Sequence, residues 1–368
     1  MDVTMTGTPD FADLVTIDQV IARARESIEP GPYEWAAAGA GQGVTTTRNS
    51  LALNCLALIP RLLRDVSTVD TTSSFVGVPL AVPVMLAPVA ALGLYDPGDA
   101  LAAAVAATRI GTSAFCAMLT GSSWEEVAST APGRHFFQIY PMGDRTWMRG
   151  IADRAEHAGF AGICVTVDSP VIGRRDRSIE SDFGWAVPSE GTESLNRHGF
   201  DYAYRTTFTW PDLAWLCAHI DLPVIVKGIM AAEDAIEAIH CGVAAVYVSN
   251  HGGRMVDQGL STIEVLAEVV EAVGSEAEVA VDSGFTRGAD VCKALALGAR
   301  AVGIGRLQCW GLAVGGAMAL GRALEILERE ISSTMANIGC GSVADITPGH
   351  VRWSIPAPAA DFQTGIDA

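Results

Sequence analysis

Charged residues are scarce in this 368-residue chain, and positive charge is scarcest. Charged residues make up 18% of the sequence and hydrophobic residues 49%, with a mean hydropathy of +0.29. This composition excludes an intrinsically disordered chain and supplies enough apolar surface for a large core. The 24 Lys and Arg residues against 42 Asp and Glu leave a net charge of −18. Because phosphate backbones and anionic lipids attract positive charge, nucleic acid and membrane partners are disfavoured.

Targeting and metal-binding signals are also missing. No basic segment followed by an apolar one stands at the N-terminus, so no secretory signal is expected. The uncharged run 76–95 is long enough to cross a membrane, but Pro79, Pro83 and Pro88 would break a helix, which predicts buried strand and turn. The eight cysteines include no Cys-x-x-Cys pair. This favours buried, reduced thiols in a cytoplasmic protein over a metal or disulfide site.

Three segments, 151–168, 234–250 and 290–306, share one pattern. Each is a helix-period stretch that ends at a glycine (Gly159, Gly242, Gly298) and is followed by an apolar, β-branched run. A glycine in this place ends a helix in the left-handed conformation. Continuous apolar runs are typical of parallel strands that are covered on both faces. The segments therefore predict a repeated helix–strand unit.

Eight apolar runs, most with a helical pattern behind them, predict a single (β/α)8 TIM barrel. They lie at 84–88, 112–116, 135–140, 223–227 and 278–282 and at the ends of the three repeated segments. No Gly-x-Gly-x-x-Gly follows the first run, which removes the usual Rossmann fingerprint. We expect one domain over 1–368, with an N-terminal helical cap at 16–80, a polar lid loop after strand four at 176–208 and an extended tail at 345–368.

Polar residues follow six of the predicted strands in succession. The active site of such a barrel lies at the carboxyl ends of its strands. One polar strand end is common in a core, whereas six that converge favour a shared active site. The residues are Gln138, Tyr140, Thr166, Asp168, Lys227, Ser249, Asn250, His251, Asp282, Gly305 and Arg306.

The last two strand ends favour a phosphate site. Residues 282–288 offer backbone N–H groups at the start of a helix, and Gly305 stands beside the cation of Arg306. Loops after strands seven and eight are the recurrent phosphate grip of these barrels. The alternative is that Gly284 and Gly305 only turn the chain.

The segment 249–254 (SNHGGR) favours catalysis. A histidine on a strand-end loop can act as a general base near neutral pH, and Arg254 can hold a carboxylate. A lone histidine is often structural, but flanking glycines and Asp168 at another strand end favour the catalytic interpretation. The pair Arg174–Arg175 is either a second anion clamp or a solvated basic pair. Lys227 would need a nearby anion or aromatic ring if buried, and is otherwise a surface lysine.

These motifs resemble the FMN-dependent α-hydroxy-acid oxidase/dehydrogenase family, from about residue 16 to about 350. The similar segments are 87–90 (APVA), 136–140 (FFQIY), 166–175 (TVDSPVIGRR), 224–228 (VIVKG), 249–254 and 282–306. The resemblance implies FMN at the barrel mouth. The implied cofactor residues are Pro88, Val89, Ala90, Gln138, Thr166, Lys227, Ser249, Asp282, Gly284, Arg287, Gly305 and Arg306.

The resemblance also implies catalytic roles. His251 would take a proton as the substrate is oxidised, and Asp168 would pair with the imidazolium. Lys227 would stabilise the reduced flavin. Arg175 and Arg254 would bind the substrate carboxylate. Tyr140 would bind the substrate hydroxyl. By analogy with the family, we expect a homo-oligomer, a tetramer or octamer.

Several positions depart from the family pattern. Trp35 stands where the family has a carboxylate-binding tyrosine, and Leu119 where it has a tryptophan. A serine becomes Ala117, an arginine becomes Thr286 and a glycine becomes Ser283. With Trp35 and Leu119 in the substrate site, we expect a bulky, mandelate-like (S)-2-hydroxy acid, oxidised to the 2-oxo acid with O2 or another acceptor. The alternatives are an oxidase of a different substrate and another FMN- or phosphate-binding barrel, such as an isomerase.

Overall fold

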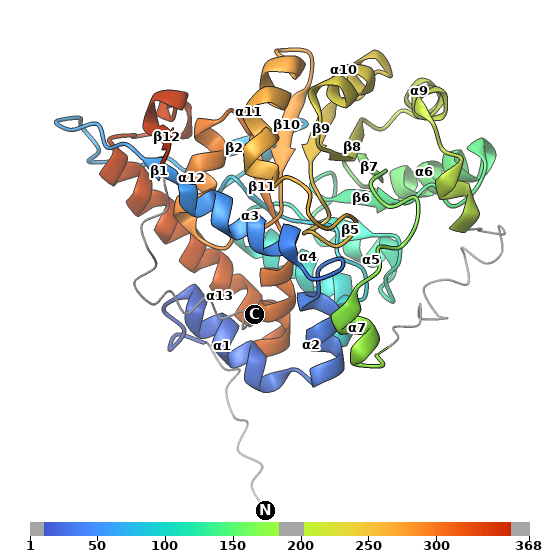
Figure 1. The fold of residues 1–368 in the computed structure, drawn as a ribbon, viewed down its shortest axis with the longest axis horizontal. Coiled ribbons are helices and arrows are strands. Elements are labelled where there is room, and N and C mark those ends of the chain that lie inside the picture. Colours follow the sequence, from blue (N-terminus) through green and yellow to red (C-terminus); the bar gives the residue numbers. More distant parts are fainter. Residues whose placement is uncertain (1–10, 184–201, 355–368) are drawn as a thin grey trace, which may run out of the picture.

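A parallel β-barrel forms the centre of the computed structural model, which describes residues 11–183 and 202–354. Eight strands follow one another in the order β4-β11-β10-β9-β8-β7-β6-β5, and the parallel bridge between Leu86 and Ala114 joins the last to the first. This confirms the predicted (β/α)8 barrel (Figure 1). The strands are β4 (Val84–Leu86), β5 (Phe115–Ala117), β6 (Phe136–Ile139), β7 (Ile163–Thr166), β8 (Val224–Ile229), β9 (Ala245–Val248), β10 (Glu278–Val281) and β11 (Ala301–Ile304).

Helices surround the barrel and place their apolar faces against it. Gly159 ends α6 with φ +97°, and Gly242 and Gly298 follow α10 and α12 with φ +86° and +100°. The left-handed glycines of the repeated unit are therefore confirmed. The surrounding helices are α4 (Asp99–Ile110), α5 (Trp124–Ser129), α6 (Arg145–Ala158), α9 (Trp210–His219), α10 (Ala232–His240), α11 (Thr262–Val273), α12 (Gly288–Ala296) and α13 (Arg306–Ile338).

A hairpin closes the amino-terminal end of the barrel. The strands β2 (Ser73–Phe75) and β3 (Val78–Leu80) pair antiparallel, and Phe75 packs edge-on against Phe136 at the start of β6. The hairpin also bonds to the starts of two strands, since Ser73 donates to the carbonyl of Arg300 and the N–H of Val76 donates to Glu278. The uncharged run 76–95 thus forms strands and turns, as its prolines predict. The open end is opposite, at the strand carboxyl ends.

The helix α13 is long and apolar enough to span a membrane by length and composition alone. In the structure, 61% of its most apolar window is buried inside the protein, and the helix packs against α1, α4 and α12. The non-helical angles of Gly315 and Gly316 interrupt it. In this fold α13 is therefore a core helix.

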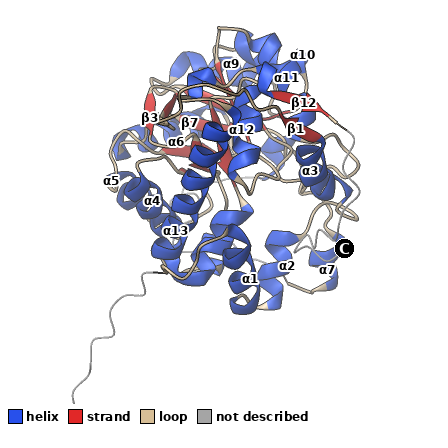
Figure 2. Cartoon of the chain, turned by 90° about the vertical axis from the view of Figure 1, so that its left-hand side faces the viewer, coloured by secondary structure: helices blue, strands red, loops and turns tan. Residues whose placement is uncertain are grey.

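The N-terminal cap holds both helices and strands. It comprises α1 (Ile17–Ser27), α2 (Pro30–Ala37), α3 (Val44–Cys55) and β1 (Leu56–Leu58), and β1 pairs with β12 (Val351–Trp353). The cap is thus not purely helical, and part of the expected tail is a strand, while 355–368 lie outside the described residues. Of the expected lid, α7 (Asp176–Glu180) lies beside α2 (Figures 1 and 2), a 3-10 helix covers Tyr202–Thr206, and 184–201 lie outside the described residues.

One ion pair ties the cap to the barrel helices and makes stability depend on pH. Two nitrogens of Arg48 on α3 donate to the carboxylate of Glu264 on α11 at 2.7 and 2.8 Å. Arg48 and the capping bonds with Ser261 lower the pKa of Glu264 from its usual 4.5 to about 2. Because the folded pKa is the lower one, the contribution is complete above pH 4.5 and is lost as the pH falls toward 2.

We expect Glu264→Gln to lower the free energy of unfolding by about 1–2 kcal/mol at pH 7. A fully buried ion pair would contribute more, but solvent screens the half-exposed Arg48. The difference from the wild type should shrink as the pH falls from 4.5 toward 2. Urea unfolding at pH 7 and pH 3 measures this, with Glu268→Gln, an exposed glutamate of the same helix, as control. An equal loss at both pH values would contradict the assignment.

Candidate active site

His251 and Asp168 come together at the open end of the barrel. Asp168 follows β7 and His251 follows β9, and Nδ1 of His251 lies 2.8 Å from Oδ1 of Asp168. This hydrogen bond occupies Nδ1 and leaves Nε2 as the nitrogen for a substrate. Burial raises the pKa of Asp168, but the charges of His251 and Lys227 outweigh burial, so the pKa lies below its usual value. Asp168 is therefore an ionised partner at neutral pH.

The turn that carries His251 has three left-handed residues in succession. The φ angles are +58° at His251, +69° at Gly252 and +75° at Gly253. A side chain at Gly253 would have its Cβ 2.6 Å from the backbone nitrogen of Thr46, so the cap leaves room only for glycine here. Strained backbone at a non-glycine residue is a feature of functional sites. The two glycines after His251 thus suit the left-handed backbone of this turn, and the contact with Thr46 requires the one at 253.

Lys227 is buried and contacts a carboxylate, a hydroxyl group and an aromatic ring. Its Nζ lies 3.0 Å from Oδ2 of Asp282 and 5.2 Å from the ring centroid of Tyr247, and it donates to Oγ of Ser249 at 2.5 Å. Burial lowers the pKa of Lys227, but the carboxylates of Asp282 and Asp168 outweigh it and raise the pKa. The lysine is therefore charged. It is buried, not the surface lysine of the alternative interpretation.

Three half-buried arginines, Arg175, Arg254 and Arg306, lie close enough together for their charges to interact. Burial and the charges of Arg175 and Arg306 hold the pKa of Arg254 well below its usual value, and burial lowers that of Arg306 to about 10. Arg254 donates to the carbonyls of Trp35 and Ala36, and Arg306 to those of Ala36 and Gly252. Within residues 11–183 and 202–354, no carboxylate pairs with any of the three guanidinium groups. The cluster therefore favours bound anions.

Trp35 lies beside two of these arginines. The Cζ atoms of Arg254 and Arg175 lie 4.7 and 6.0 Å from its ring centroid, in cation–π range. The neighbouring Arg174 instead is exposed and pairs with Asp176 at 3.0 Å. Only one member of the Arg174–Arg175 pair thus reaches the cluster, and Nε of Arg175 is buried without a hydrogen-bond partner.

Tyr140 lies beside Arg205, a residue that the sequence did not predict to be part of the site. Burial and the charge of Asp168 raise the pKa of Tyr140 to about 12, so the phenol is neutral near pH 7. Cζ of Arg205 lies 5.8 Å from the Tyr140 ring centroid. Arg205 lies in the 3-10 helix Tyr202–Thr206 and not at a strand end, so only its cationic character could have suggested it. Leu119 is buried directly after Met118, whose sulfur accepts from the N–H of Tyr140.

The residues expected around a flavin ring lie at the carboxyl ends of the barrel strands. Gln138 donates to Thr166 at 2.9 Å, and both are buried. Pro88, Val89 and Ala90 are half-buried at the end of β4. These residues thus lie at the strand carboxyl ends, where the cofactor is expected.

The two glycines of the expected phosphate site differ in their surroundings. A Cβ at Gly305 would meet no atom within 4 Å, so the start of α13 borders open space. A Cβ at Gly284 would collide with Asn49 of the cap. An open helix N-terminus beside the half-buried cation of Arg306 fits a phosphate group. The donors of this end of the barrel therefore fit a phosphorylated cofactor.

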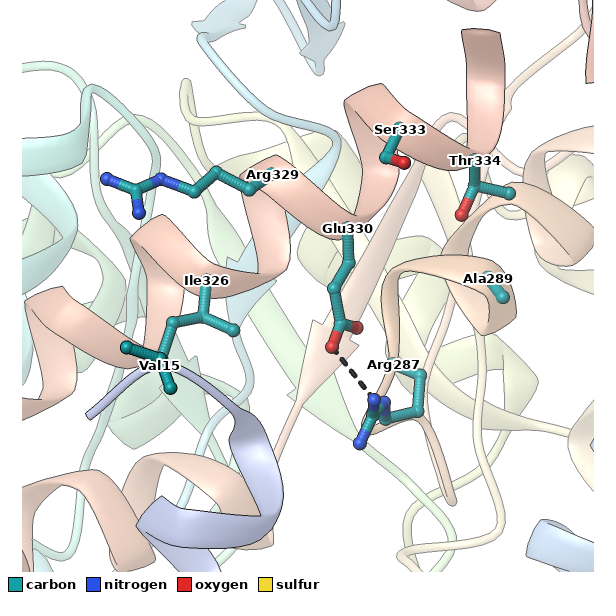
Figure 3. Close-up of a pocket in the computed structure, with 8 residues that line it drawn as sticks. All are labelled: Val15, Arg287, Ala289, Ile326, Arg329, Glu330, Ser333 and Thr334. Atoms are coloured by element: carbon teal, nitrogen blue, oxygen red, sulfur yellow. Dashed lines mark ion pairs between the residues drawn. The ribbon is translucent and has the colours of Figure 1, made fainter. Parts of the chain in front are cut away.

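Arg287 lies apart from this cluster. Its guanidinium pairs with Asp18 and Glu330 at 3.0 and 3.1 Å, in a surface pocket between the N-terminal segment, α12 and α13 (Figure 3). Glu330 also accepts from the N–H of Gly288 at the start of α12. Because these carboxylates draw the side chain outward, the structure does not bring Arg287 to the expected cofactor residues.

Comparisons with known proteins agree with this geometry. Residues 24–353 match the family described as FMN-dependent dehydrogenase. L-lactate oxidase from Nostoc sp. is 37% identical over 342 residues, which cover 88% of this chain and 94% of that protein. Glycolate oxidase 1 from Oryza sativa subsp. indica is 37% identical over 358 residues, which cover 93% and 96%.

Solved structures agree as well. The crystal structure of mandelate oxidase superposes with a TM-score of 0.86 at 36% identity and covers 93% of this chain and 99% of that one. Similarity of this extent covers the barrel, the cap and every strand end described above. The chain belongs to the family of FMN-dependent dehydrogenases and is an FMN-dependent oxidoreductase of the hydroxy-acid oxidase type.

Proposed function

We propose that the protein oxidises an (S)-2-hydroxy acid with a bulky, aromatic side chain to the 2-oxo acid. The observation that carries this proposal is the half-buried arginine pair, Arg175 and Arg254, at the same end of the barrel as the His251–Asp168 hydrogen bond. A small acid needs a carboxylate clamp, and oxidation of its hydroxyl group needs a base. FMN, when bound, supplies the two-electron acceptor.

The side chains of the site bind the substrate and accept its proton. Arg175 and Arg254 bind the two carboxylate oxygens, since a guanidinium group matches that geometry. The neutral phenol of Tyr140 can hydrogen-bond to the substrate hydroxyl. Nε2 of His251 takes the hydroxyl proton, because Nδ1 is held by Asp168. The ionised Asp168 then stabilises the imidazolium.

Three observations favour an aromatic side chain. Leu119 is smaller than the tryptophan that the family resemblance places there, which leaves room for a ring. Structures of mandelate oxidase, one with benzoyl-formic acid, cover 93% of this chain with TM-scores up to 0.86. Trp35 adds a flat apolar surface beside the arginines.

Anaerobic bleaching of the yellow flavin tests the proposal. We expect (S)-mandelate to reduce the flavin with a higher kcat/KM than (S)-lactate or glycolate, and (R)-mandelate to be inactive. Trp35→Tyr should lower the preference for mandelate over glycolate about tenfold, since one altered pocket contact changes discrimination by this amount. Stopped-flow measurement across the four acids gives both ratios.

Two outcomes would count against the proposal. An unchanged preference in Trp35→Tyr would remove Trp35 from the substrate site. A yellow protein that no 2-hydroxy acid bleaches would favour another FMN-dependent reaction, such as an isomerisation.

A further inference from the structure

We propose that Ser283 is a positioning residue that joins the Lys227–Asp282 ion pair to the turn that carries His251. Ser283 is buried and has a φ of +80°, a left-handed conformation that is costly for any residue except glycine. The family resemblance places a glycine at this position. A strained serine where glycine fits without strain points to a task for its hydroxyl group.

The hydroxyl group of Ser283 makes two hydrogen bonds. It donates to Oδ1 of Asp282 at 2.8 Å and accepts from the N–H of Gly252 at 3.0 Å. The other carboxylate oxygen of Asp282 pairs with Nζ of Lys227 at 3.0 Å. Ser283 thus fixes the orientation of the Asp282 carboxylate toward the lysine.

A second hydroxyl group makes the parallel connection. Oγ of Ser249 accepts from Nζ of Lys227 at 2.5 Å and from the N–H of His251 at 3.1 Å. The consecutive N–H groups of His251 and Gly252 are therefore each held by a serine, and both connections end at Lys227. Glycine at 283 would leave one of the two unmade. The left-handed conformation of His251 depends on this double hold.

The carboxylate clamp has contacts that do not involve Ser283. Arg254 donates to the carbonyls of Trp35 and Ala36 in the cap, and Arg175 comes from the loop after β7. Loss of the Ser283 hydroxyl should therefore disturb the base and the lysine, with substrate binding retained. The role of Ser283 can therefore be tested by measuring the lysine and the base separately from substrate binding.

Two variants separate strain from hydrogen bonding. Ser283→Ala keeps the left-handed strain and removes the hydroxyl group, whereas Ser283→Gly removes both. The control is Ser73→Ala, which removes a hydroxyl that donates to Arg300 at the opposite end of the barrel. We expect Ser283→Gly to melt at a higher temperature than Ser283→Ala, since glycine adopts this φ freely.

Lysine labelling reads the ion pair directly. The chain has two lysines, Lys227 and Lys293, and both are buried. Holoprotein is treated with an amine-reactive reagent, and the labelled peptides are quantified by mass spectrometry with Lys293 as internal reference. We expect Lys227 to react about tenfold faster in both Ser283 variants, the size of one lost hydrogen bond to a charged group, and at the wild-type rate in Ser73→Ala.

Flavin reduction is the second measurement, and it rests on the proposed function. In both variants we expect the rate constant for reduction by the best 2-hydroxy acid to fall about tenfold, with its dissociation constant unchanged. Wild-type labelling of Lys227 in both variants would overturn the proposal, as would an unchanged reduction rate. If faster labelling accompanies a wild-type protein that no 2-hydroxy acid reduces, the proposed function fails while the structural coupling stands.

Discussion

Replacing His251 by asparagine should slow flavin reduction by a 2-hydroxy acid by roughly three to five orders of magnitude, while FMN stays bound. Asparagine can hydrogen-bond to Asp168 but cannot take a proton. The effect is large because the same side chain supplies the base and orients the substrate hydroxyl. Anaerobic stopped-flow spectroscopy measures the rate constant, and the visible spectrum of the purified variant reports the bound flavin.

His219→Asn is the matched control for this result. His219 is exposed on α9 and stacks on Trp215, far from the strand ends in the fold. It should reduce its flavin at the wild-type rate. If the His251 variant also did so, the assignment of the base would be wrong.

Arg175→Lys should lower kcat/KM for the 2-hydroxy acid by about 10²–10³, the effect of losing a buried, charge-assisted carboxylate contact. Lysine keeps the charge but lacks the planar fork that holds two oxygens. The loss should fall on both KM and kcat, because a tilted substrate presents its hydroxyl poorly to His251. Steady-state kinetics measures both terms.

The adjacent arginine provides the control. Arg174→Lys changes a side chain that is exposed and paired with Asp176, so its kcat/KM should match the wild type. An equal loss in the two variants would mean that the loop, and not the guanidinium of Arg175, accounts for the effect. A wild-type value for Arg175→Lys would remove the residue from the carboxylate clamp.

Much of the fold and of the site could be predicted from local patterns. The glycines at 159, 242 and 298 end helices by their own backbone freedom, whatever surrounds them. Parallel strands bring their carboxyl ends to one opening, so residues that follow different strands, such as Asp168 and His251, meet there. The same reasoning showed that Lys227 needed an anion or a ring, and both are present.

Other features could not be predicted because distant segments decide them. Arg287 carries the same side chain as Arg306, yet Asp18 and Glu330 draw it outward. Arg205 contacts the ring of Tyr140, although the two residues are 65 positions apart along the chain. The cap itself holds Arg254, whose partner Trp35 is 219 residues away along the chain.

The amino-acid sequence by itself determined the barrel, the end at which its site lies and the residue types gathered there, since strand periodicity and helix-ending glycines act over a few residues. Only the tertiary structure decided which of Arg174 and Arg175 faces the site, where Arg287 points and why Ser283 tolerates a left-handed backbone. Those outcomes depend on contacts between residues tens to hundreds of positions apart. No pattern of neighbouring residues encodes them.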